Sequence, residues 1–154
     1  MTAIDARLRE LGIELPEAPT PAANYVPWVR AGALVFVSGQ IPMVDGKPGF
    51  VGKLGEDMSV EEGQAAARTC ALALLAQVKV ACDGDLDRVV RCLKLGGFVN
   101  CAPDFTDHPQ VINGASNLMV DVLGDTGRHA RFAVGAASLP FGVAVEVDGI
   151  FEVR

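Results

Sequence analysis

The sequence predicts an α+β fold in which helices pack on one face of a mixed β-sheet. Two long segments carry apolar residues at helical spacing, a β-rich run precedes them, and the last third of the chain alternates apolar and polar residues as strands do. The expected order after a short first helix is a β-hairpin, a helix, a strand, a helix and two strands. The 154 residues, half of them apolar, fit one domain, expected over residues 1–154.

The first third of the chain is expected to hold the short helix and the hairpin. Residues 2–11 place apolar side chains on one helical stripe, and residues 16–27, rich in proline and alanine, are expected to be extended. The β-rich run 29–37 predicts one strand. The Asp-Gly pair at 45–46 predicts a turn, after which residues 50–51 return as the hairpin partner.

The remaining elements are two helices and three strands. Ser59 and Glu62 form the pattern of a capping box, so a long helix is expected to begin there and to end at the Asp-Gly pair 83–84. A strand, a second helix and two strands follow, over residues 89–99, 109–123, 131–137 and 143–153.

Helices on one side of a sheet leave the other face to be covered. That face must be polar or must meet another subunit. The small residues Ala133, Gly135 and Ala137 are expected to lie on it, where they suit close contact better than water. The pattern therefore favours an oligomer.

Composition excludes several classes of function. The chain has 13 Lys and Arg against 19 Asp and Glu, a net charge of -6, and no basic run, which disfavours binding to nucleic acid. No apolar stretch is long enough to span a membrane, and the charged N-terminal residues do not resemble a signal peptide, so a cytoplasmic protein is expected. Four cysteines without a Cys-x-x-Cys pair, and only two histidines, lack zinc spacing. Neither a metal nor a cofactor is expected.

The candidate chemistry is carried by polar residues within apolar segments. The sequence has no nucleophile elbow, phosphate-binding loop or dinucleotide loop, so covalent catalysis is disfavoured. The polar candidates are Tyr25, Ser38, Gln40, Asn113, Arg131 and Glu146. Taken alone, Arg131 also fits a structural role in a strand, and Glu146 also fits the solvated face of an alternating strand.

Several motifs around these candidates resemble the RidA (YjgF) family. They are Val-Ser-Gly-Gln-Ile-Pro at 37–42, Ile-Asn-Gly-Ala at 112–115, Ala-Arg-Phe-Ala-Val at 130–134, Leu-Pro at 139–140 and Val-Glu-Val at 145–147. Their order and spacing are similar to those of the family from about Tyr25 to the C-terminus. Residues 105–112, the N-terminal helix and residues 52–57 are longer than in the short enzymes, so the chain resembles a longer subgroup.

The resemblance implies a chorismate-mutase-like fold and a homotrimer with clefts between neighbouring subunits. It also implies an enamine/imine deaminase that converts reactive 2-imino acids of the 2-aminoacrylate type into 2-keto acids and ammonia. The family's carboxylate-binding arginine falls on Arg131 and its water-activating glutamate on Glu146. Tyr25 and Asn113 match further site residues. Ala133 replaces the family cysteine but keeps the backbone carbonyl that is credited with holding the water.

The residues themselves can support that chemistry. A guanidinium offers two parallel donors to a carboxylate, so Arg131 can orient a 2-imino acid, and Glu146 can deprotonate a water for attack on the imine carbon. A non-catalytic trimer that binds small carboxylates is the second hypothesis, since it also needs Arg131. An endoribonuclease is the third, and the acidic charge disfavours it.

Overall fold

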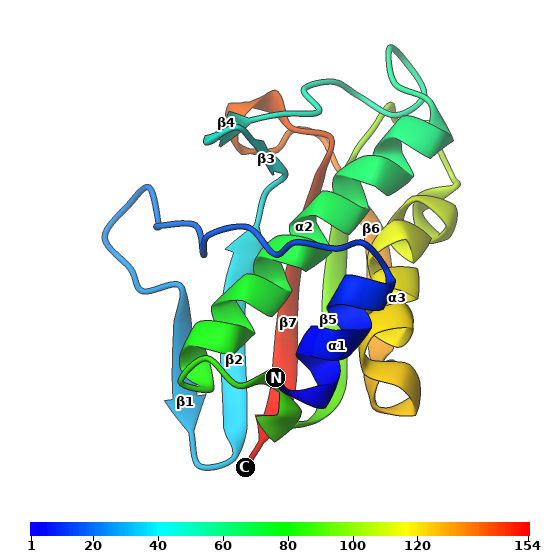
Figure 1. Cartoon of the computed structure of the whole chain (residues 1–154). Helices are drawn as coiled ribbons and strands as arrows, with labels where there is room; N and C mark the ends of the chain where they lie inside the picture. Colours follow the sequence, from blue (N-terminus) through cyan, green and yellow to red (C-terminus); the bar gives the residue numbers. More distant parts are fainter.

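The computed structural model describes residues 1–154, and its centre is a mixed five-stranded sheet in the order β1-β2-β7-β5-β6 (Figure 1). The strands are β1 (Trp28–Ala31), β2 (Leu34–Gln40), β5 (Val89–Asn100), β6 (Ala130–Ala136) and β7 (Val145–Val153). Only the pair β5–β6 is parallel, and the other neighbours are antiparallel. The predicted α+β class with a mixed sheet is confirmed.

The helices lie together on one face of this sheet (Figure 1). They are α1 (Ala3–Glu10), α2 (Val60–Ala81) and α3 (His108–Leu123), with 3₁₀ turns at Leu86–Arg88, Gly124–Gly127 and Pro140–Gly142. Helix α2 begins as predicted, because the Ser59 hydroxyl accepts a hydrogen bond from the Glu62 amide. The apolar stripes of α2 and α3 pack on β5 and β7 and form a core of 31 buried residues. No helix of the chain has both the length and the apolar character needed to cross a membrane.

The predicted first hairpin was wrong in detail. The run 29–37 is not one strand, since β1 and β2 pair with each other across a turn at Gly32, whose φ of 59° suits glycine. The turn at 45–46 is confirmed, but it joins β3 (Met43–Val44) to β4 (Lys47–Pro48). Residues 50–51 lie outside that hairpin, and Val51 instead forms a bridge to Val143.

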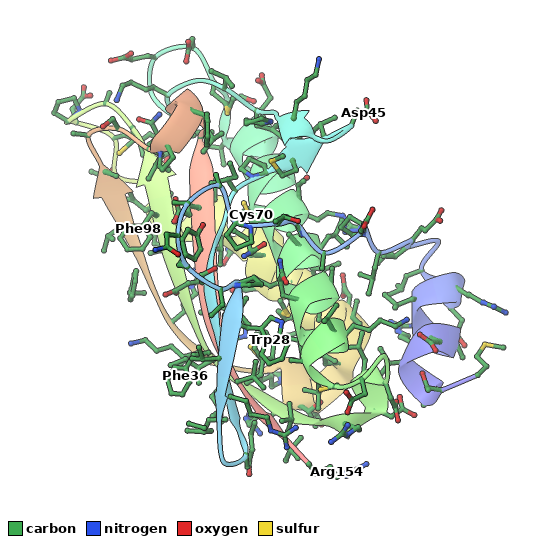
Figure 2. The ribbon with its side chains drawn as sticks, turned by 90° about the vertical axis from the view of Figure 1, so that its left-hand side faces the viewer. Trp28, Phe36, Asp45, Cys70, Phe98 and Arg154 are labelled. Atoms are coloured by element: carbon green, nitrogen blue, oxygen red, sulfur yellow. The ribbon has the colours of Figure 1, made fainter.

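The second face of the sheet carries no helix. Alternate residues of β7 are buried against the helices, and those between them, beginning with Glu146, point the other way. Figure 2 shows Phe36 and Phe98 on this open face, turned away from α2. Phe98 packs edge-to-face on Phe132 at 5.3 Å between ring centroids, and Phe36 and Val134 are exposed. The open face therefore carries a group of apolar side chains beside the acids of β7.

The small residues of β6 do not lie on that face, which corrects the prediction. Ala133 packs on the core, and a β-carbon at position 135 would lie 2.8 Å from His108 Nε2 at the start of α3. Ala137 lies beyond the end of the strand. The alternation is set by Arg131, which bonds to α3, so the residues at 132 and 134 are the ones that face outward.

Candidate functional site

The predicted site residues fall into two groups on different sides of the sheet. Tyr25 and Glu146 line one pocket, which we call the Glu146 pocket. Arg131 lies at the edge strand β6 against α3, close to Asn113 and Ala133. We call these three residues the Arg131 cluster.

The Glu146 pocket is a cavity of about 420 Å³ beside the end of β2. Its polar side chains are those of Thr20, Tyr25, Ser38, Gln40 and Glu146. Its apolar lining comes from the proline-rich segment before β1 and from the two turns at Met43–Pro48 and Pro140–Phe141. The cavity is large enough for a small organic acid.

The pocket wall is built by side chains that hold an irregular segment in place. Gln77 of α2 is buried and donates to the Pro19 carbonyl at 2.6 Å. The Ser38 amide and hydroxyl both donate to the Pro27 carbonyl, at 2.9 and 3.1 Å. Residues 19–27 lack regular structure, so these contacts fix the loop that presents Tyr25, which is half exposed.

The absence of a side chain at Gly39 leaves room for the Glu146 carboxylate. The β2–β7 register shifts between Val37 and Gln40, and a β-carbon at position 39 would lie only 2.1 Å from Glu146 Oε2. Any side chain there would collide with the carboxylate. The Ser-Gly-Gln motif thus has a steric reason, because the missing side chain leaves the space that Glu146 occupies.

Glu146 is electrostatically unusual. The residue is half-buried, and its carboxylate forms no ion pair or hydrogen bond within the chain. Burial, and secondarily the charge of Asp148, raise the pKa of the Glu146 carboxyl. A carboxylate with a raised pKa is a stronger base than an exposed one, which suits proton abstraction from water.

Arg131 also lacks a charged partner. Its Nη1 donates to Ser116 Oγ and its Nη2 to the Pro109 carbonyl, both at 3.0 Å. The chain's four ion pairs do not include it, although the net charge is -6. A half-buried guanidinium with no acid beside it, and with N–H groups to spare, is a ready site for a carboxylate.

Asn113 and Ala133 complete the Arg131 cluster. Asn113 lies four residues after Pro109 and three before Ser116, so all three occupy the face of α3 that meets Arg131. Ala133 is two residues from Arg131 along β6 and therefore shares its face of the sheet. Asn113 and Ala133 therefore lie on the same side as Arg131, whose own hydrogen bonds go to Ser116 and Pro109.

The two groups are not brought together within one chain. Arg131 pairs with Leu95 on the helix side, whereas Glu146 pairs with Phe98 on the open side. They are two strands and three residues apart, which puts their α-carbons about 14 Å from each other with side chains on opposite faces. Within one chain, Arg131 and Glu146 therefore do not line a common pocket.

Other reactive groups offer no alternative centre. No cluster of three or more His, Cys, Asp or Glu side chains could hold a metal ion. All four cysteines are buried, and burial raises the pKa of the Cys92 thiol to about 12. Cys101 lies 3.4 Å from His108 Nε2, but burial raises the pKa of its thiol too, so the sulfur is not activated.

Sequence reasoning missed Ser116 and His129, which lie behind Arg131. Ser116 Oγ is 2.8 Å from His129 Nε2 and accepts from Arg131. The signal in the sequence is slight: one residue is a helix turn after Asn113 and the other is two before Arg131. Their meeting depends on how α3 packs on β6.

Comparison with known proteins gives the family. Residues 5–150 match the family model described as "YjgF/chorismate mutase-like, putative endoribonuclease". The chain is 52% identical over 152 residues to the Trypanosoma cruzi protein TCP17, covering 98% of this chain and 94% of the relative.

Two solved structures are also similar over nearly the whole chain. The Agrobacterium tumefaciens protein Atu1372, described as of unknown function, is 52% identical with a TM-score of 0.92, over 98% of this chain and 92% of that one. A Shewanella oneidensis protein with the same endoribonuclease description is 35% identical with a TM-score of 0.94, over 99% and 100% of the two chains. The similarity thus extends over nearly the whole of this chain, its N-terminal residues included.

Proposed function

This chain belongs to the YjgF/chorismate mutase-like family, and from that premise we propose that it hydrolyses reactive 2-imino acids to 2-keto acids and ammonia. The observation that supports it is a pair of opposite charges without partners. Arg131 and Glu146 are each half-buried and unpaired, and they match the family residues that bind the carboxylate and activate water.

In the proposed reaction Arg131 binds the substrate carboxylate through two parallel N–H groups. This contact fixes the neighbouring C=N carbon, and Glu146 accepts a proton from a water whose oxygen attacks that carbon. Glu146 returns this proton to the nitrogen, which gives the carbinolamine. A proton then passes from the carbinolamine hydroxyl to the nitrogen through Glu146, the C–N bond breaks as the carbonyl forms, and ammonia leaves with Glu146 ionised again. One imine and one water give one keto acid and one ammonia.

We further propose that a second copy of the chain completes the site. Within one chain Arg131 and Glu146 lie on opposite faces of the sheet, so they cannot both contact the same small substrate. The open face carries exposed Phe36 and Val134 beside Phe98, a surface suited to burial against another copy. The family resemblance implies that the assembly is a homotrimer with three equivalent clefts.

The direct test is hydrolysis of imines made in the assay by an amino-acid oxidase. Keto-acid and ammonia release above the spontaneous rate supports the deaminase. Binding of 2-keto acids without any acceleration of imine hydrolysis would instead establish the carboxylate-binding trimer. The control is Arg131→Ala, which removes the proposed carboxylate contact.

The family's endoribonuclease description supplies a second candidate. Phosphate binding draws on clustered Lys and Arg, whereas this chain has six more acids than bases. Cleavage of a labelled RNA by wild type and by Glu146→Gln decides the matter, since cleavage that needs Glu146 would favour the nuclease.

A further inference from the structure

A line of polar groups runs from Arg131 into the protein. Arg131 Nη1 donates to Ser116 Oγ at 3.0 Å, and Ser116 Oγ lies 2.8 Å from His129 Nε2. The other ring nitrogen, His129 Nδ1, lies 2.6 Å from the Gly127 carbonyl oxygen. Three elements meet here, because Ser116 belongs to α3, His129 precedes β6, and Gly127 ends the 3₁₀ turn.

The two ends of this line, together with a neutral imidazole, fix the direction of every hydrogen bond in it. A carbonyl only accepts, so Nδ1 carries the imidazole proton and donates it to Gly127. A neutral ring then leaves Nε2 as an acceptor for the Ser116 hydroxyl. A guanidinium only donates, so the Ser116 oxygen accepts from Arg131. Each hydrogen bond in the line then has one donor and one acceptor, and no two donors or two acceptors face each other.

The surroundings keep His129 in the neutral form that this line requires. Burial, with a smaller contribution from the charge of Arg131, lowers the pKa of His129. Arg128 pairs with Asp125, so the nearest acid in the turn is engaged elsewhere. A protonated His129 would direct an N–H at the hydroxyl and place a second cation behind the guanidinium.

We propose that Ser116 and His129 are positioning residues that hold the Arg131 guanidinium in the orientation that receives the substrate carboxylate. The inference rests on the proposed function of Arg131. Without Ser116 the side chain keeps only the bond from Nη2 to the Pro109 carbonyl, about which the guanidinium can turn. His129 acts one step further back, because it orients the hydroxyl so that the oxygen lone pairs face Arg131.

The first test separates binding from chemistry in Ser116→Ala and Ser116→Thr. Ser116→Ala should raise KM for 2-imino acids at least about tenfold, as for one lost hydrogen bond to a charged group, while kcat changes little. Ser116→Thr restores the hydroxyl and should return KM close to the wild-type value. Equal KM values in wild type and Ser116→Ala, with both folded by circular dichroism, would overturn the inference.

The second test follows His129 and needs no turnover. Nitrogen-15 NMR of the imidazole at neutral pH should show a proton on Nδ1 and a bare Nε2. His129→Gln offers Ser116 an acceptor near the place of Nε2, whereas His129→Phe offers none, so His129→Phe should weaken carboxylate binding more. A proton on Nε2, or equal binding by the two variants, would contradict the positioning role.

Binding of 2-oxobutanoate measured by calorimetry distinguishes this inference from the proposed function. If wild type binds the keto acid but hydrolyses no imine, and Ser116→Ala binds it at least about tenfold more weakly, the hydrolase fails and the positioning role stands. If wild type hydrolyses imines and Ser116→Ala binds as well as wild type, the positioning role fails alone. If wild type neither binds the keto acid nor hydrolyses imines, both fail.

Discussion

Gly39→Ala should remove activity by moving one carboxylate while the fold survives. The added β-carbon would lie 2.1 Å from Glu146 Oε2, and ordinary contact begins at 3.4 Å, so the oxygen must move by about 1.3 Å. The atom displaced is the far end of a flexible side chain, which makes the movement cheap. Since misplacing a catalytic group by about 1 Å can cost about 10²-fold, kcat should fall by that factor or more.

The stability of the Gly39→Ala variant should change little. Position 39 has an ordinary φ, so alanine restricts the unfolded chain and contributes about 0.4–1 kcal/mol that offsets the local crowding. The assay is keto-acid formation from imines generated in place, with thermal unfolding followed in parallel. In the double variant with Glu146→Gln, the glycine change should cost nothing further, because its effect runs through Glu146. Wild-type turnover by Gly39→Ala, or additive losses in the double variant, would refute the reasoning.

Three more predictions concern the charged residues and the open face. Arg131→Ala should keep the fold and lose about 2–5 kcal/mol of substrate-binding free energy. Arg131→Lys keeps the charge but not the paired donors, so it should impair both KM and kcat. Unchanged kinetics in either variant would exclude the carboxylate contact. Glu146→Gln should lower kcat about 10²–10⁴-fold with little change in KM. Glu146→Gln should also raise the midpoint of thermal unfolding at pH 7. Burial raises the pKa of Glu146 in the folded state, so the charged carboxylate destabilises the fold above that pKa. The advantage of glutamine should therefore fade as the pH falls toward 4. Val134→Glu should put a charge on the exposed apolar face and yield monomers by light scattering, and an oligomer of unchanged mass would show that copies associate elsewhere.

Local patterns in the sequence predicted most of the fold. The Ser59 cap, the helical spacing after it and the alternation from Val145 onward each depend on neighbours in the chain, and they gave α2 and β7 nearly to the residue. The prediction of a single strand over 29–37 was wrong because Gly32 lies among β-forming residues. The local sequence does not show whether such a glycine bends a strand or ends it. The prediction of which side of the sheet the small β6 residues occupy was wrong for a related reason. The residues at 133 and 135 are both small, so the sequence does not distinguish a buried side of the strand from an exposed one there.

The candidate site was predictable only in part. The motifs identified Arg131 and Glu146 as candidates. The alternation of residues within each strand does not predict that the two lie on opposite faces of one sheet, because this depends on how β5 pairs with β6 and β7. Ser116 and His129 were missed because their contact arises from the packing of α3 on β6. Long-range register decides both points.

A mixed oligomer tests the shared site most directly. Arg131→Ala and Glu146→Gln chains, each inactive alone, can be co-expressed with different tags and the mixed species isolated. A mixed trimer holds one cleft in three that takes an intact Arg131 from one chain and an intact Glu146 from the next, so the isolated mixed species should recover about one third of wild-type turnover. Chains of both kinds mixed in one oligomer with no recovered activity would contradict a site shared between subunits.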